Sequence, residues 1–581
     1  MKRTTLREIA HARSGEKGRG SNISVIAYDP KDYEILRSQV TVAAVAKLYG
    51  PITKGSITRY EVSASGALNF VLEDVLEGGR TRTLAFEEGG KALSSLMLTM
   101  PLEVPDDFVG RAQKVAAGLK PVYAVPTFST GKRVRLGSGS AWSRDRFEPA
   151  EDLVERGNLD YLCFDAMSEI TMSMAQVARM DGSTALPYDP MLDMRLGPLL
   201  KPCKEKGVKI ITNAGWLDPV AAAERILEMA RQQGIKDLKV GAVCGGILTD
   251  KIADMDLNFT ETRERIADYR SSIVSAEAYL GAEGIVEALR QGADVVITTR
   301  VADACVYLGP LIHEFNWDMN DHDLMSKGMI IGHLMECGSQ VCGGYFADPG
   351  YKDVPDLDEI GNPIAEVSAD RILITKLPGT GGIVSAATCK EQLLYEVQDP
   401  ARYFCPDVIA DFTKVHVREV GKDEVEVIAD KTGAPKTSTL KALVGLSEGF
   451  MTEEMALFAG PGALERAEMT KALLQKRFKK VNLQATDLRF DYVGINSVHR
   501  EASPVPTAAP YEVILRIGLK TTDKKEAEKL RREIDPLAVN GVSGNGKWAT
   551  AVPGSRVRPL IGLNSTLVPR GAVPFSVVMR Q

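Results

Sequence analysis

Residues 132–300 alternate short apolar runs with stretches of helical sequence, and this alternation limits the fold more than any other feature of the chain. The apolar runs read VRLGSGSAW, LDYLCFD, VKIITNAG, LKVGAVCG and DVVITTR. Between the third and fourth runs, Ala222, Ile226 and Met229 recur at the spacing of one helix face. Strands that alternate with helices in this way predict a parallel sheet covered by helices, either as an open doubly wound sheet or as part of a barrel.

Polar residues stand where these predicted strands end. Those after the first, second, third and fifth runs are Ser138, Ser140, Arg144, Asp165, Ser168, Glu169, Asn213, Arg300 and Asp303. The carboxyl ends of parallel strands meet at one edge of a sheet, and ligands of open α/β sheets bind there. We therefore expect a site at this edge. Its catalytic residues would be Asn213, Arg300 and Asp303, and its substrate-binding residues would be Ser138, Ser140 and Arg144.

The turn Gly137-Ser138-Gly139 has the beginning of a dinucleotide-binding fingerprint. Trp142 stands where that fingerprint requires its third glycine for close packing of the helix. The sequence therefore argues against a classical NAD site.

A second cluster of polar residues lies in the segment HLMECGSQVCGGYFADPGY. His333, Glu336, Cys337 and Gln340 fall at helical spacings there, so we expect one face of a short helix to present all four, with Glu336 catalytic and Gln340 binding substrate. The alternative is that the apolar neighbours pack a core and the polar residues make structural bonds. Two further alternatives are a metal site at His333, Glu336 and Asp303, and a nucleophilic Cys337. No HxH or HExxH pairs any of the six histidines, so a metal is not expected.

Residues 1–104 have the strand and helix order of a ferredoxin-like α+β domain, and the proline-bearing residues 105–130 are expected to form a linker. The stretch RSGEKGRGSN at residues 13–22 joins three glycines to hydroxyls and cations. Such a loop can hold an anion through backbone N–H groups, and we expect Ser14, Lys17, Arg19 and Asn22 to do so. The alternative is an ordinary solvated loop.

The remaining chain is expected to divide into a Rossmann-like α/β domain at residues 131–340 and an α+β domain at residues 341–581. The second of these contains the glycine-rich turn Pro378-Gly379-Thr380-Gly381-Gly382. Thr380 and Gly381 could hold a carboxylate or phosphate there, or the segment could be a plain tight turn.

Charge, cysteine content and hydropathy indicate which partners and which cellular compartment to expect. The net charge of −6 gives no general basic field for nucleic acid. The eight cysteines include no CxxC pair, which indicates buried free thiols in a reducing cytosol. No apolar run approaches the roughly 20 residues that span a bilayer, and the N-terminus lacks the apolar middle of a signal peptide. We expect a cytoplasmic protein, a homo-oligomer, with neither nucleic acid nor membrane as a partner.

Several long motifs resemble one known family. VRLGSGSAWSRDRFEPA, VITTRVADA, HLMECGSQVCGGYFADPGY, LPGTGGIVS and DPARYFCPDV are similar to the acyclic terpene utilisation AtuA family over about residues 131–581. The N-terminal HARSGEKGRGSNISVIA and GALNFVLE resemble the small ferredoxin-like domain of the same family. In many relatives the small domain follows the large one, so here the resemblance implies an order-swapped fusion. Relatives are associated with the breakdown of acyclic terpenoids and branched acyl units, beside acyl-CoA carboxylases and hydratases.

The resemblance implies a substrate class and no defined reaction. Our first hypothesis is a hydratase or lyase acting on a branched carboxylate or its CoA thioester, in which Glu336 or Asp303 moves the proton and Asn213 polarises a carbonyl. The second is a non-catalytic binding or scaffold subunit of an acyl-CoA carboxylase pathway. No cofactor is required beyond the CoA of a thioester substrate. We also expect the N-terminal domain to complete the site by placing Lys17 and Arg19 opposite an acyl pocket, against the alternative that the domains merely share a chain.

Overall fold

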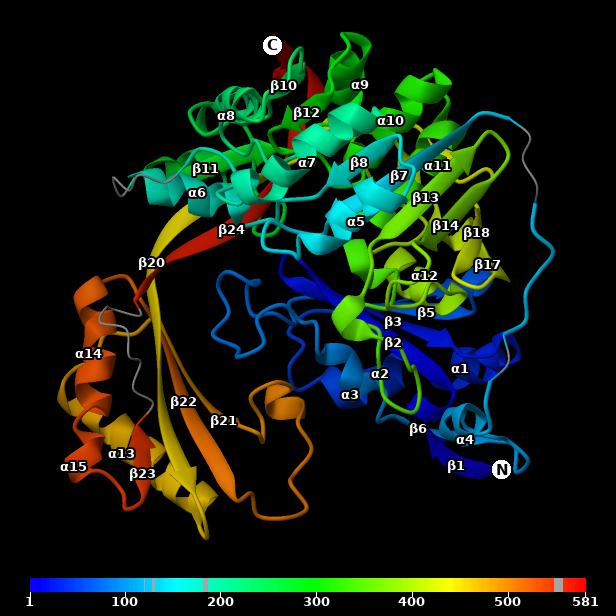
Figure 1. Ribbon diagram of the computed structural model, residues 1–581. Coiled ribbons are helices and arrows are strands. Elements are labelled where there is room, and N and C mark those ends of the chain that lie inside the picture. The colour runs from blue at the N-terminus through cyan, green and yellow to red at the C-terminus, as the bar shows by residue number, and fades with distance from the viewer. Residues whose placement is uncertain (120, 128–130, 181–185, 548–556) are drawn as a thin grey trace.

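The structure is a computed structural model that describes residues 1–119, 121–127, 131–180, 186–547 and 557–581. Of the expected linker, residues 120 and 128–130 lie outside this described part. The chain forms a large α/β domain, an N-terminal domain packed against it, and an outlying α+β region at the end of two long strands (Figure 1).

A ten-stranded mixed sheet is the centre of the large domain. Its five middle strands are parallel, in the order β7 (Arg133–Ser140), β8 (Tyr161–Phe164), β9 (Lys209–Thr212), β12 (Val295–Thr298) and β10 (Val240–Gly245). Antiparallel strands extend both sides: β13 (Pro363–Ser368), β14 (Ile372–Lys376), β18 (Glu424–Ile428) and β17 (His416–Gly421) beyond β7, and β25 (Phe575–Arg580) beyond β10. The expected α/β fold is confirmed, and strands from both sides of residue 340 share this one sheet.

Helices cover both faces of the sheet. One core contains Tyr161 and Cys163 and the other contains Leu162 and Phe164, because successive side chains of a strand point to opposite faces. The helices against the first core are α9 (Glu283–Arg290), α10 (Cys305–Phe315), α11 (His322–Met335) and α12 (Ala386–Leu393). Those against the second are α5 (Glu148–Arg156), α7 (Leu192–Lys206) and α8 (Pro219–Gln232). Burial on both faces is what makes the central strands continuous apolar runs in the sequence.

A second sheet leads away from this domain. Strand β20 (Thr439–Ala459) pairs with β11 (Ile273–Ala278), β22 (Glu512–Thr521), β23 (Asn545–Lys547) and β24 (Arg558–Pro569), and β21 (Asp487–Val493) pairs with β22. The long β20 and β24 carry an outlying unit that also contains α13 (Ala463–Lys480), α14 (Lys524–Ile534) and α15 (Leu537–Asn540). Helix α6 (Thr171–Met180) lies against β11. A small sheet of β15 (Tyr403–Phe404), β16 (Ile409–Ala410) and β19 (Gly433–Ala434) completes the large domain.

The N-terminal domain is ferredoxin-like, as expected. Its four-stranded antiparallel sheet has the order β2 (Ala10–Lys17), β3 (Gly20–Ala27), β5 (Ala67–Leu72) and β4 (Ile57–Val62). Helices α1 (Tyr33–Gln39), α2 (Val42–Tyr49) and α3 (Leu93–Met97) share a core with one face of this sheet. A pair of strands, β1 (Lys2–Thr5) and β6 (Pro101–Val104), closes the domain, and α4 (Arg111–Ala116) follows.

The other face of the same sheet packs on the large domain. Asn22 and Asn69 donate to backbone carbonyls of Leu394 and Val397, at 2.7 and 2.9 Å, just after α12. Ile26 and Ala67 form a small buried cluster with Leu394. Because β2, β3 and β5 are buried on both faces, the docking surface belongs to the core of the protein.

Among the described residues, none of the helices is long and apolar enough to cross a bilayer.

Candidate functional site

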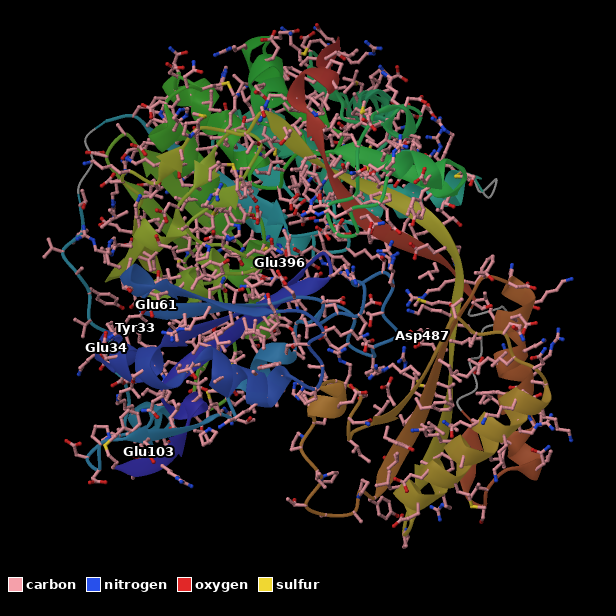
Figure 2. The ribbon with its side chains drawn as sticks, turned by 180° about the vertical axis from the view of Figure 1, so that it is seen from behind. Tyr33, Glu34, Glu61, Glu103, Glu396 and Asp487 are labelled. Atoms are coloured by element: carbon pink, nitrogen blue, oxygen red, sulfur yellow. The ribbon has the colours of Figure 1, made fainter. Side chains whose placement is uncertain are left out.

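Hairpin β2–β3 brings Lys17 into the large domain. Alternate residues of β2, from His11 through Arg13 and Gly15 to Lys17, face the large domain, and the residues between them face the helices of their own domain. Lys17 is the last residue of β2, and its Nζ lies 3.9 Å from Oε2 of Glu396. Figure 2 shows Glu396 where the N-terminal domain meets the large one. Lys17 is thus a cation that this hairpin supplies to the junction, beside Glu396.

The Lys17 ammonium is held in its charged form. Burial would lower its pKa, but nearby acidic groups outweigh burial and raise the pKa well above its usual value; these groups are Tyr403, Glu396, Glu169 and Tyr279. The side chain still keeps 35% of its surface exposed. A charged and reachable ammonium is suited to binding an anion, and it is not suited to acting as an amine nucleophile.

Arg300 lies two residues after the end of β12 and is a second cation of a charged cluster at this junction. The members of the cluster are Lys17, Asp165, Glu169, Glu277, Tyr279, Arg300, Asp303, Glu336, Glu396, Tyr403 and Lys441. Arg300 is 3% exposed, its Nη2 lies 3.2 Å from Oδ1 of Asp303, and its guanidinium carbon lies 4.3 Å from the centre of the Tyr279 ring. Burial would lower its pKa, but Asp303, Tyr279 and Asp165 raise it. Within the described residues, its Nε and Nη1 have no hydrogen-bond partner. Two donors of a fixed fork therefore remain for a ligand oxygen.

Lys441, from strand β20, is the third cation. Its Nζ lies 3.2 Å from Oε1 of Glu169. Burial would raise the pKa of Glu169, but Lys441 and Lys17 together lower it to about 2. Glu169 is therefore an anion that holds ammonium groups from both domains.

Three carboxyl groups of the cluster have raised pKa values. Burial raises the pKa of Asp165 well above its usual value, and the charge of Asp303 adds to this effect. Burial raises the pKa of Glu277 to about 8, against the opposing charge of Arg300. Burial also raises the pKa of Glu336, although His333 acts to lower it. Glu169 and Glu396, by contrast, have lowered pKa values beside the lysines, so the cluster combines three cations with carboxyl groups of both high and low pKa.

Glu336 is fixed by the end of helix α11. The helix stops at Met335, and Glu336 accepts from Nδ1 of His333 over 3.0 Å. The His333 ring lies 5.2 and 5.1 Å from the rings of Tyr403 and Phe412, centre to centre. Glu336 remains 12% exposed, so it is within reach of a ligand. A raised carboxyl pKa suits a group that moves a proton near neutral pH.

The expectation that one helix face presents His333, Glu336, Cys337 and Gln340 is wrong. Helix α11 ends at Met335, Gly338 adopts a φ of +52°, and Gln340 lies in a separate 3₁₀ turn at Gly338–Gln340. Gln340 then accepts from Nη2 of Arg13 over 2.7 Å, so its amide links the two domains.

Asn213, Ser138 and Ser140 are buried and support the cluster from within the large domain. Asn213 Nδ2 donates to Asp165 Oδ1 and its Oδ1 accepts from the backbone of Ala166, both at 2.7 Å. Ser140 Oγ donates to the carbonyl of Asp165 over 2.7 Å, and Ser138 Oγ accepts from Tyr307 over 3.0 Å. All three are fully buried. Their geometry positions Asp165 and the strand ends.

The other expected substrate-binding residues lie away from the cluster. Residues 13–22 form a hairpin and not a loop, so their backbone groups are paired in the strand ladder. Ser14 points to its own domain and donates to the carbonyl of Lys91, and Arg19 pairs with Asp74 at 3.1 Å. Asn22 binds Asn69 and Leu394 at the interface. Arg144 is exposed on the segment after β7.

The glycine-rich turn at Thr380 and Gly381 is also not part of the charged cluster. Thr380 donates to the carbonyl of Leu377 over 2.8 Å, and its own carbonyl accepts from Lys376 over 2.7 Å. A Cβ on Gly381 would lie 1.8 Å from the carbonyl oxygen of Asp356. Close packing of the chain therefore accounts for this glycine.

The sequence places Asp165 and Glu169 at a predicted strand end but gives neither a role. It does not indicate Glu277, Tyr279 or Lys441, because these residues lie within or beside strands of the second sheet and carry no local signal. In the described part of the chain, no three His, Cys, Asp or Glu side chains are grouped to hold a metal ion.

Comparison with known families gives two matches. The family described as acyclic terpene utilisation family protein AtuA matches residues 134–579. The AtuA ferredoxin-like domain matches residues 4–103. No curated protein and no solved structure matches the chain.

Proposed function

Since the chain belongs to the acyclic terpene utilisation AtuA family, we propose that it is a cytoplasmic enzyme of acyclic terpene breakdown that transfers a proton on a carboxylate or its CoA thioester. The single observation that supports this most is the convergence of Lys17, Arg300 and Lys441 on a set of carboxyl groups whose pKa values are spread apart. Pairs of titratable groups with separated pKa values are typical of acid–base sites.

The cations would hold the acyl end of the substrate. Lys17 and Lys441 offer ammonium groups, and Arg300 offers the Nε and Nη1 donors that no other described residue uses. Donors placed at a carbonyl or carboxylate oxygen stabilise the negative charge that develops when a proton leaves the adjacent carbon. The charges of Lys17, Arg300 and Lys441 have the sign that this requires.

Glu336 would move the proton. In a hydratase or lyase, the ionised carboxylate takes the proton from the carbon next to the carbonyl, and the electron pair of that C–H bond forms the C=C bond. The C–O bond at the next carbon breaks, and the departing hydroxyl takes a proton from a carboxylic acid to leave as water. Asp165 can supply that proton, because burial keeps it protonated and because its Oδ1 already accepts from Asn213 and Met167. Its Oδ2 is then the atom that carries the proton.

Asp303 and Asn213 take supporting roles in this proposal. Asp303 is 31% exposed and pairs with Arg300, so it orients the guanidinium and can contact the ligand. Asn213 acts through Asp165, because both ends of its amide are engaged. A homo-oligomeric state is also part of the proposal.

Hydrogen exchange tests the proton transfer without knowledge of the full reaction. The purified chain would be incubated in D₂O with branched acyl-CoA thioesters and with the free acids, and ¹H NMR would follow the signal of the protons next to the carbonyl. We expect exchange with at least one thioester or acid, and we expect its loss in Glu336→Gln. Ligand binding without exchange for any compound would contradict catalysis and leave the non-catalytic binding role.

A further inference from the structure

A cavity of about 130 Å³ lies where three parts of the chain meet. The lining comes from the N-terminal domain, from the start of α6 with the residue before it, and from strands β20 and β24. Its apolar lining is Ile170, Met174, Met451, Pro559 and Ile561. Arg80, Glu88 and Arg558 form its polar rim.

Two short links connect this cavity to the charged cluster. Ile170 in the wall directly follows Glu169, whose carboxylate holds Lys441. Arg80 at the rim lies 3.1 Å from Oε1 of Glu16, and Lys91 pairs with both Glu16 and Glu396, the partner of Lys17. The cavity therefore adjoins the cluster at Glu169, and a chain of ion pairs connects its rim to Lys17.

The size and lining of the cavity suit an aliphatic group. An apolar cavity of about 150 Å³ accepts benzene, which has six carbons, so this one has room for about five or six carbons. Methionine side chains adapt to irregular or branched shapes, and Met174 and Met451 both line this cavity. The rim ion pairs do not close the opening firmly: Arg80 and Arg558 lie 3.5 and 3.7 Å from Glu88, and all three side chains are 39–59% exposed.

We propose that this cavity binds the aliphatic end of the substrate whose acyl end is held by Lys17, Arg300 and Lys441. The inference rests on the proposed function, and it adds the substrate class. The ligand is an amphipathic acid or thioester with a chain long enough to extend from the cluster into the cavity. Short acids bind at the cluster alone. Each methylene group that enters the cavity should improve affinity by roughly fourfold.

Filling the cavity tests the proposal. Met174 lines the opening and is 43% exposed, so Met174→Trp can occupy the cavity without being forced into a closed core. Met180→Trp is the matched control, because Met180 is on the same helix, is 64% exposed and does not line the cavity. Calorimetry on the full chain would compare butanoate, decanoate and the neutral 1-octanol. Both variants should keep the wild-type melting temperature.

The expected pattern separates this proposal from the proposed function. In Met174→Trp, decanoate and 1-octanol should bind at least about tenfold more weakly, which corresponds to the loss of two or more buried methylene groups, while butanoate binds as in wild type. Met180→Trp should bind all three as wild type does. Equal binding of butanoate and decanoate to the wild type, or equal behaviour of the two variants, would overturn the cavity and leave the proton-transfer site standing. If 1-octanol binds and is displaced by the tryptophan while neither acid binds, the cavity stands and the acyl-binding cluster fails.

Discussion

His11 of the N-terminal sheet and Glu391 of helix α12 meet across the domain junction, with Nδ1 of the histidine 2.5 Å from Oε1 of the glutamate. Lys352 contacts the same oxygen over 2.9 Å, and all three side chains are less than 8% exposed. The two domains therefore share a buried, hydrogen-bonded charge cluster, and docking of the N-terminal domain depends on its protonation state.

The stability of the protein should decrease as the pH falls below about 6.5, the unfolded value for histidine. Burial lowers the pKa of His11 more than Glu391 raises it, so the unfolded chain binds a proton at a higher pH than the folded chain does. Between these two pKa values stability is lost with falling pH, by up to about 1.4 kcal/mol per unit. Glu391 has a lowered pKa, because Lys352 and His11 outweigh its burial, and it adds a loss of the same sign at lower pH.

Melting temperatures from pH 8 to pH 5 measure this dependence. His11→Gln should flatten the slope near pH 6, and His416→Gln, at an exposed histidine, should leave it unchanged. A wild-type melting temperature that rises as the pH falls from 7 to 5 would contradict this sign.

Glu336→Gln should abolish proton exchange while the fold persists. The change keeps the volume and removes the carboxylate that moves the proton, so the rate should fall by about two orders of magnitude or more. Because burial already disfavours the ionised form of Glu336, the melting temperature should stay the same or rise. A variant that is inactive because it precipitates would show instead that Glu336 is a structural partner of His333.

Arg300→Lys should weaken the binding of a branched acid such as 3-methylbutanoate by about tenfold or more. Lysine keeps the charge but cannot reproduce the two free donors of the guanidinium fork. Arg144→Lys is the control, since Arg144 is an exposed arginine on the segment after β7. Equal affinities for the wild type and Arg300→Lys in calorimetry would remove Arg300 from the binding site.

Cutting the linker should leave the two domains bound to each other. Val122 and Val125 are 87% and 81% exposed, so a protease site inserted beside Val122 is accessible. Strands β2, β3 and β5 bury a face on the large domain, and we expect the cut chain to elute as one species and to keep its activity. Separation of the fragments at neutral pH with full activity in residues 131–581 would show that the N-terminal domain is an independent module.

Much of the fold could be predicted because its signals are local. Runs such as LDYLCFD are apolar throughout since their strands are buried on both faces, and the strand ends at Asn213, Arg300 and Asp303 follow from the same pattern. The glycines of residues 13–22 favour a flexible anion-binding loop in the sequence, and this expectation is wrong. Gly15 is instead a strand residue, and a Cβ there would lie 2.6 Å from Glu396.

The site itself could be predicted only in part, because it depends on long-range contacts. Lys17 was a candidate from composition, but strand alternation separates it from Ser14, and only the folded chain shows which of the two faces the cluster. Lys441 lies near the start of the long strand β20, where a single lysine in the sequence indicates a solvated position. No feature near it in the sequence indicates its bond to Glu169.

If the two domains build one anion-binding site, the affinity of the full-length chain for 3-methylbutanoate in Lys17→Met and Arg19→Met shows it most directly. Both residues are cations of the same hairpin, but Lys17 lies in the cluster whereas Arg19 pairs with Asp74 outside it. Loss of one charged hydrogen bond costs about 1.5–3 kcal/mol, so Lys17→Met should bind roughly 10- to 100-fold more weakly, while Arg19→Met binds as the wild type does. Wild-type affinity in Lys17→Met, or an equal loss in both variants, would contradict a site built from both domains.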